Sequence, residues 1–243
     1  MRALLSWFWD KPFETPLQPW REALHDRFLL PHHVWKDFKS VMDDLSHAHD
    51  MPFRADWFEA QFEFRFPEVG KTEVDGVHLS LRNGIEPWLV LGEESGAGGT
   101  SRYVDSSLER VQIKVSGDWK DRHVLTCNGI ELPLADWGDG VRGLGIRFRS
   151  WQPWSSLHPT IPAHAPLVFD LYDREAGRSL GGCAYHIAHQ GGRAHETRPI
   201  NDLEAEGRRR VRFVPGSQTP GPFTPHVPRP NPYQRDTLDL RFV

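Results

Sequence analysis

Beyond about residue 107 the chain consists of short segments in which apolar and polar side chains alternate. Residues 111–115 read Val-Gln-Ile-Lys-Val, a pattern with a period of two that is typical of a strand buried on one face only. Between residues 124–127 and 130–134 stands Asn128-Gly129, the strongest short signal for a tight hairpin turn. The pattern continues in segments 144–149, 167–172 and 179–189. Strands this short and this closely spaced predict a mostly antiparallel β-sandwich.

The first fifty residues follow a helical period instead. Between Pro31 and Leu45 apolar side chains recur at spacings of three and four, which predicts an amphipathic helix. Proline suits the first turn of such a helix. Residues 17–30 are expected to be helical as well. From about residue 60 the period becomes two: Phe62-Glu63-Phe64-Arg65-Phe66 alternates strictly and predicts a strand, and further strands are expected at 74–81 and 88–91.

These patterns predict an α+β fold in which helices and a small antiparallel β region precede the sandwich. The glycine-rich segment 92–100 is interpreted as a linker, so the expected parts are residues 1–95, residues 100–215 and a tail over 216–243. Residues 215–232 contain seven prolines, which predicts an extended tail. A short helix is expected near residues 201–210.

The composition excludes several classes of protein. A net charge of −4 and a pI near 6.3 provide no broad basic field, so a general nucleic-acid binder is not expected. The two cysteines are too few for a disulfide scaffold and indicate reduced thiols in a cytoplasmic protein. No segment approaches the roughly 18 apolar residues of a membrane span, so no membrane partner is expected.

Four charged residues near the predicted strand over 62–66 are candidates for chemistry: Glu63, Arg65, Arg82 and Glu86. On a strand, Glu63 and Arg65 would share the face opposite the phenylalanines. Carboxylates and arginines on a sheet could hold Mg²⁺ and a nucleotide. The same residues would also occur on the solvated face of a half-buried sheet, and this second interpretation is favoured.

A group of histidines raises the question of a metal site. The group consists of His158, His164, His186, His189 and His195, with Asp170, Cys183 and Glu196 in the same region. Zinc accepts three or four such ligands. Successive side chains of a strand point to opposite faces, however, which separates His186 from His189. No metal is therefore expected, although a metal-dependent hydrolase that uses His158, His164, His186 and His189 stays an alternative.

The segment Gly181–Arg193, which reads GGCAYHIAHQGGR, contains the other binding candidates. Cys183, Tyr185 and His189 would share one strand face and could line a common site, while Cys183 alone is more typical of a small buried hydrophobe. Trp151 and Trp154 could form an aromatic patch with Tyr185. A stand-alone β-sandwich that serves as a binding module is thus a further alternative.

Several blocks of sequence, in their order along the chain, resemble one protein family. The blocks are Arg2–Leu5, Leu24–His32, Phe62–Pro67, Ile85–Trp88, Arg102–Ser107, Leu125–Gly129, His158–Ile161, His164–Asp170 and Gly181–Arg193. Over residues 1 to about 220 the chain is similar to the C-terminal portion of a large bacterial family of proposed amidoligases. Members of this family commonly carry an N-terminal transglutaminase-like protease domain. The chain departs from the family pattern at Ser80, where a glutamate is expected.

The resemblance implies an ATP-dependent carboxylate–amine ligase related to the glutamine-synthetase-like superfamily, with ATP and Mg²⁺ as cofactors of the full-length protein. The acidic blocks of the family lie largely before the position that matches the start of this chain. The chain is therefore expected to be a C-terminal fragment or split-gene product without most of the catalytic core. Residues 1–95 would complete the ligase core, and residues 100–215 would form an accessory module. We expect no cofactor for this chain alone. The expected partners are the missing ligase or transglutaminase-like portion, or a split partner chain, and a peptide substrate.

Overall fold

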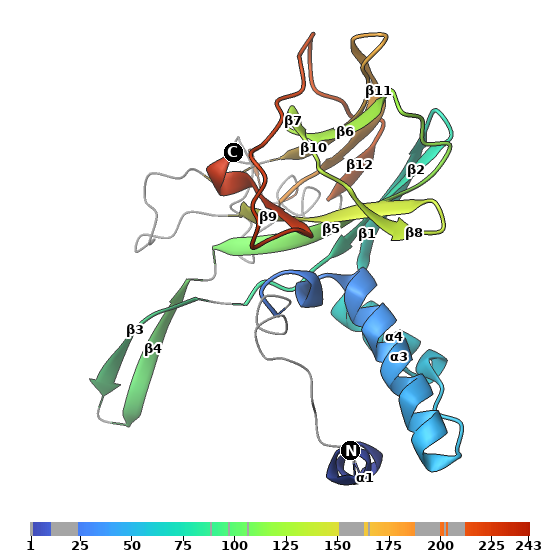
Figure 1. Cartoon of the computed structure of the whole chain (residues 1–243). Helices are drawn as coiled ribbons and strands as arrows, with labels where there is room; N and C mark the ends of the chain where they lie inside the picture. Colours follow the sequence, from blue (N-terminus) through green and yellow to red (C-terminus); the bar gives the residue numbers. More distant parts are fainter. Residues whose placement is uncertain are drawn as a thin grey trace.

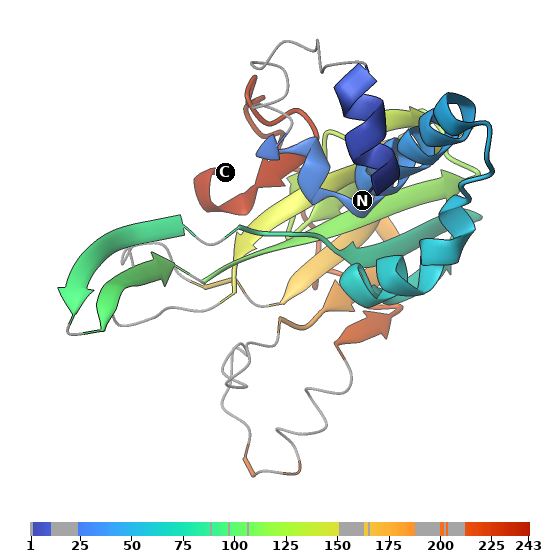
Figure 2. The same ribbon diagram turned by 90° about the horizontal axis from the view of Figure 1, so that it is seen from below.

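The computed structural model contains two large β-sheets and a separate two-stranded hairpin, with a group of helices on the outer face of the first large sheet (Figure 1). It describes residues 2–10, 24–87, 89–96, 98–105, 107–150, 163–164, 166–187, 200–201, 203 and 212–243. Viewed from below, α1, α3 and α4 lie on the near side of the first sheet (Figure 2). The predicted α+β class is confirmed.

The helical group contains three α-helices and two short 3₁₀ helices among the described residues. They are α1 (Arg2–Asp10), η1 (Arg27–Leu29), α3 (Pro31–His49), η2 (Ala55–Phe58) and α4 (Glu59–Arg65). Helix α3 confirms the predicted amphipathic helix: it begins at Pro31 and buries Met42 and Leu45. It ends at His49, and the next residue, Asp50, adopts a left-handed backbone (φ 48°) and donates its N–H to the carbonyl of Ser46. Residues 17–23 of the helix expected at 17–30 lie outside the described residues. Within 24–30 the expectation is wrong beyond Leu24, because a turn and the 3₁₀ helix η1 follow.

The strand predicted at residues 62–66 is wrong, because this segment forms the second half of α4. Phe62 and Phe66 are four residues apart and share a helical face, with ring centroids separated by 5.1 Å. The ring of Phe62 packs 4.7 Å from that of Trp35 on α3, whereas Phe64 is 89% exposed. Packing against α3 thus overrides the local alternation, and Glu63 and Arg65 do not share a face.

The first sheet has the strand order β1-β2-β5-β9-β13, with β8 beside β9. Its strands are β1 (Glu68–Val74), β2 (Val77–Asn83), β5 (Leu108–Gly117), β8 (Ala135–Gly138), β9 (Val141–Arg149) and β13 (Thr237–Asp239). The strand predicted at 74–81 is confirmed over residues 77–81, which belong to β2, but its start is wrong. A hairpin turn at Asp75-Gly76, with φ angles of 49° and 75°, divides the segment between β1 and β2. Such Asp-Gly pairs favour this turn because both of its positions require positive φ.

The second sheet has the order β12-β11-β10-β6-β7. Its strands are β6 (His123–Cys127), β7 (Ile130–Glu131), β10 (Leu167–Asp173), β11 (Arg178–Tyr185) and β12 (Phe213–Pro215). The predicted hairpin at Asn128-Gly129 is confirmed, with φ angles of 51° and 77°. The helix expected near 201–210 lies almost entirely outside the described residues.

The glycine-rich segment 92–100 is not a plain linker. It belongs to a two-stranded hairpin of β3 (Leu89–Gly96) and β4 (Gly99–Asp105). This hairpin extends away from both sheets (Figure 1). Strand β2 precedes it and β5 follows it, and these two strands pair directly along their length. The first sheet therefore combines strands from both sides of the segment.

The two sheets share one apolar core. Strands β2, β5 and β9 contribute alternate side chains from one side, and β6, β10 and β11 contribute them from the other. Fully buried members of this core are Leu79, Leu81, Ile113, Leu125, Leu144, Ile146, Phe148, Leu167 and Phe169. The intervening polar residues of β2 and β5 consequently face outward, toward the helices.

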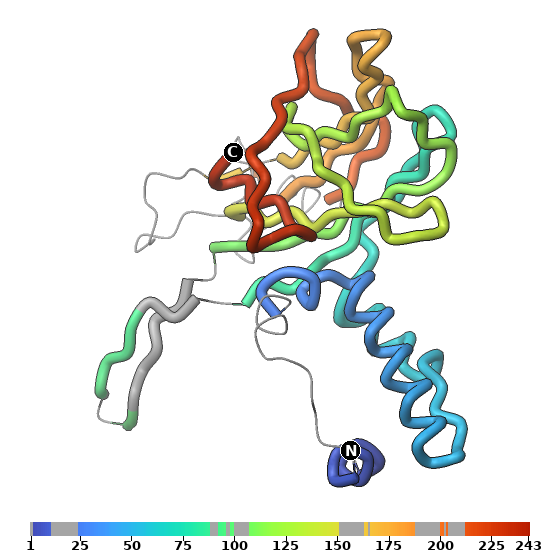
Figure 3. Tube along the Cα trace, viewed as in Figure 1, coloured from blue at the N-terminus to red at the C-terminus, as the bar shows by residue number. Residues whose placement is uncertain are grey.

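The tail connects the two sheets. After β12 the hydroxyl and amide groups of Thr219 donate to the carboxylate of Asp170, and Asp170 itself is fully buried. His226 then exchanges backbone hydrogen bonds with Gly129 and Glu131 near β7. Finally, β13 pairs with β9 in parallel. In Figure 3 this segment (red) passes beside the second sheet before it reaches the first.

Candidate functional site

A groove lies between the helices and the outer face of the first sheet, with a volume of about 350 Å³. Its floor is formed by Ser80 and Arg82 of β2 and by Gln112 and Lys114 of β5. In the strand register Ser80 is opposite Lys114 and Arg82 is opposite Gln112, so the four side chains form a compact square. The walls are formed by Pro31, His32 and Trp35 of α3, by Glu59, Phe62 and Glu63 of α4, and by Glu68 of β1.

Two of the predicted candidates, Glu63 and Arg82, meet in this groove. The guanidinium of Arg82 donates to the Glu63 carboxylate over 2.9 Å and to the carbonyl oxygen of Phe66 over 2.8 Å. A second carboxylate, that of Glu68, is 3.8 Å away. Arg82 therefore fastens α4 to β2, and Glu63 serves as its anionic partner.

The groove also has a polar wall on α3. The buried side chain of Gln112 accepts a hydrogen bond from the backbone N–H of His32 over 2.8 Å. The ring of His32 stacks on Trp137 with centroids 4.1 Å apart. Burial, reinforced by the nearby positive charges of His33 and the lysines, lowers the pKa of His32 to about 4. The imidazole of His32 is accordingly neutral at neutral pH.

Glu86, the third candidate, lies elsewhere, in a buried ionic network. Arg110 of β5 and Arg147 of β9 are direct cross-strand neighbours, and both bind the Glu86 carboxylate, over 3.0 and 2.6 Å respectively. Arg147 also lies 3.3 Å from Asp239 of the tail, which is paired with Arg241. Burial lowers the pKa of Arg110, and the Glu86 carboxylate opposes this effect. The fourth candidate, Arg65, is exposed at the end of α4.

Cys183 and Tyr185 lie in the apolar core, and the predicted common face of these two residues is confirmed. Both side chains are buried, so neither is presented to a ligand in solution. Burial raises the pKa of the Cys183 thiol to about 12, and Cys127 is also a buried free thiol. His189, Trp151 and Trp154 lie outside the described residues.

The histidine alternative involves only two described residues. The ring nitrogens of His164 are engaged with the backbone, Nδ1 with the N–H of Arg149 and Nε2 with the carbonyl of Leu240. The half-buried His186 follows β11, and its backbone N–H bonds to the carbonyl of Arg212. His158 lies outside the described residues. Within the described part of the chain, no three His, Cys, Asp or Glu residues are grouped as metal ligands.

Several groove residues were not predicted from the sequence: His32, Trp35, Glu59, Glu68, Gln112 and Lys114. Gln112 and Lys114 occupy the polar positions of an alternating strand. A strand whose polar face is exposed to solvent has the same alternating pattern. The helices that cover this face end at Arg65, far from β5 in sequence, so the local pattern of β5 does not distinguish these residues from solvated ones.

A family model described as "Putative amidoligase enzyme (DUF2126)" matches residues 1–241. The chain belongs to this family. Neither a curated protein nor a solved structure matches it. The predicted relationship to the amidoligases is thus confirmed over nearly the whole chain.

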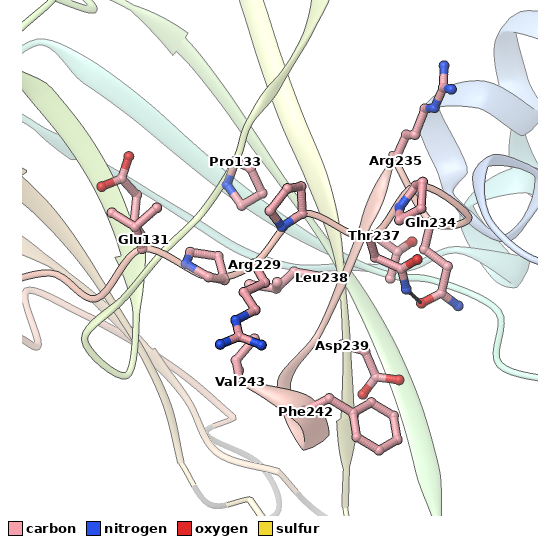
Figure 4. A pocket seen from close by; sticks show the side chains of 15 residues that line it. Glu131, Pro133, Arg229, Gln234, Arg235, Thr237, Leu238, Asp239, Phe242 and Val243 are labelled. Carbon is pink, nitrogen blue, oxygen red and sulfur yellow. Dashed lines mark hydrogen bonds between the residues drawn. The ribbon is translucent and has the colours of Figure 1, made fainter.

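This amidoligase-family chain has a second cavity, of about 470 Å³, beneath the proline-rich tail (Figure 4). It is lined by Pro133, by residues 227–232 and by the end of the chain around Leu238, Phe242 and Val243. Its two carboxylates are occupied: Glu131 binds Arg174 over 2.7 Å, and Asp239 binds Arg147 and Arg241. None of the residues singled out in the sequence lines this cavity.

One further observation concerns membranes. Among the described helices of this amidoligase-family chain, none combines the length and the apolar character needed to span a bilayer.

Proposed function

We propose that this chain is a substrate- or partner-binding part of an ATP-dependent carboxylate–amine ligase and does not itself perform the reaction. The family match over residues 1–241 supports the link to amide-bond ligation. In that chemistry, ATP with Mg²⁺ supplies the phosphoryl group that activates a carboxylate, an amine displaces the phosphate, and ADP and phosphate are released.

The observation that carries the non-catalytic assignment is the state of the two candidate carboxylates. Glu63 is paired with Arg82, and Glu86 is buried between Arg110 and Arg147. A magnesium ligand presents its carboxylate oxygens to the cation, and a guanidinium at hydrogen-bond distance repels that cation. These residues therefore do not fit a Mg²⁺–ATP site, and their ion pairs support a scaffolding role.

Binding roles are supported by two surfaces. The groove between α3, α4 and the first sheet presents polar groups of both charges at a size that suits a small ligand. The helical group also exposes large apolar side chains on α1, η2 and α4, namely Leu5, Phe8, Trp9, Trp57 and Phe64. Exposed apolar surface of this kind is typical of a contact with another protein. We assign this contact to the catalytic portion of the ligase.

The test is to measure turnover by the purified chain. Release of ADP and phosphate from Mg²⁺–ATP is followed with and without an added amine and carboxylate, beside an established amide ligase as positive control. The expected result is a rate equal to that of buffer. Turnover by the chain that disappears in Glu63→Ala, with Asp56→Ala as the matched exposed control, would overturn the proposal.

A further inference from the structure

Several polar groups of the groove have no protein partner among the described residues. Three of them matter for charge recognition: the carboxylate of Glu59, the ammonium of Lys114 and the side-chain amide nitrogen of Gln112. By contrast, Glu63 and Glu68 are both close to Arg82. After Glu63 has paired with Arg82, the groove retains the Glu59 carboxylate as an acceptor. It also retains the side chains of Lys114 and Gln112 as donors.

The free donors lie together on the floor. Gln112 and Lys114 are two residues apart on β5, so their side chains project from the same face of the strand. Only 3% of Gln112 is exposed, and its oxygen already accepts from the backbone of His32. The amide nitrogen of Gln112 is not among the buried atoms that lack a partner, so it is accessible from the groove. An oxygen ligand between Gln112 and Lys114 would accept hydrogen bonds from both side chains.

The free acceptor lies on the opposite wall. Glu59 begins α4, one turn before Glu63, and the rings of Trp35 and Phe62 line the groove beside it. A carboxylate beside aromatic rings is suited to binding an ammonium group, because the carboxylate and the ring faces both attract positive charge. Glu59 and Lys114 line the same groove, and no ion pair joins them within the described structure, so both charges can bind a ligand.

We propose that the groove binds a small zwitterion, a free amino acid or a short unblocked peptide. The ligand carboxylate would bind Lys114 and Gln112, and its ammonium group would bind Glu59. The volume of about 350 Å³ lies at the lower end of the range for small-molecule sites, which suits one or two residues. This inference rests on the proposed function, since it makes the zwitterion a substrate of the ligase.

The test is isothermal titration of the whole chain with the dipeptide L-alanyl-L-alanine. The same dipeptide is then supplied with its amine acetylated, and separately with its carboxylate amidated. Either block is expected to weaken binding by at least about tenfold, since each removes one charge-assisted contact. Blocked forms that bind as tightly as the free dipeptide, or the absence of any binding, would overturn the proposal.

Variants assign the two ends of the ligand. Lys114→Gln is expected to weaken binding of the free dipeptide by about tenfold and to leave binding of the amidated form unchanged. Glu59→Gln is expected to weaken binding of the free dipeptide in the same way and to leave binding of the acetylated form unchanged. Lys39→Gln, an exposed lysine of α3 outside the groove, is the matched control. A contrary result is that inorganic phosphate displaces the free dipeptide while Glu59→Gln leaves dipeptide binding unchanged. That result would show a site for anions in general and would reject the zwitterion proposal. Phosphate release from ATP, measured on the same samples, reports separately on the proposed function.

Discussion

The carboxylate of Glu86 lies 3.0 Å from the guanidinium of Arg110, and the two side chains are only 5% and 1% exposed. Arg147 approaches the same carboxylate from the neighbouring strand, and Arg110 also donates to the hydroxyl of Thr237. The network thereby joins the segment before β3, two central strands and the tail. Its position indicates that Glu86 organises the fold.

Glu86→Gln is expected to lower the free energy of unfolding by about 3–5 kcal/mol, because it leaves the buried guanidinium of Arg110 without its paired carboxylate and removes one of the two carboxylates beside Arg147. Urea denaturation measures the change. Glu131→Gln, which breaks the more exposed pair with Arg174, is the control and should cost at most about 1 kcal/mol. Equal effects of the two substitutions would show that the Glu86 network is not structural.

Stability should depend on pH through His32. The pKa of His32 in the folded chain is about 4, below the roughly 6.5 of an unfolded chain. As the pH falls between these values the unfolded state takes up the proton first, so stability is complete above the upper value and is lost toward the lower one. His32→Gln should reduce this loss, whereas the exposed His47→Gln should not. NMR titration of the His32 ring with a midpoint above about 6 would contradict the account.

Both thiols should be unreactive in the native chain. Cys127 and Cys183 are fully buried, and burial raises the pKa of each of them, so almost no thiolate is available for attack. A chromogenic disulfide reagent should detect neither cysteine before unfolding and both of them in guanidinium chloride. Stoichiometric reaction of the folded chain would show that β11 is more accessible than its packing indicates.

Gly182→Ala should disrupt the second sheet. A Cβ atom at this position would lie 1.7 Å from the carbonyl oxygen of Phe169 on β10, and backbone atoms cannot move aside as a flexible side chain does. The expected loss is at least about 3 kcal/mol in the free energy of unfolding. Gly92→Ala is the control, because no atom lies within 4 Å of its added Cβ. A stable Gly182→Ala chain would place β10 and β11 farther apart than described.

The features that could be predicted from the sequence are those decided by local pattern. The apolar spacing of α3, the alternation of β5 and β9 and the turn at Asn128-Gly129 each depend on a few adjacent residues. The common face of Cys183 and Tyr185 also follows from strand parity alone. In these segments local preference and tertiary packing favour the same structure.

The features that could not be predicted depend on distant contacts. Phe62 and Phe66 alternate as in a strand, but the packing of Phe62 on Trp35 makes a helix the better solution. Arg110 looks like a solvated position of β5, yet it binds Thr237, which is 127 positions away. The groove floor likewise arises from the register of β2 and β5, which a single sequence does not specify.

Calorimetry on one sample distinguishes a chain that binds a ligase substrate from one that activates it. Mg²⁺–ATP is titrated first, and L-alanyl-L-alanine is titrated into the same cell afterwards. We expect no binding heat for the nucleotide and a saturable heat for the dipeptide. Saturable binding of Mg²⁺–ATP with no response to the dipeptide would contradict the proposed role of the chain.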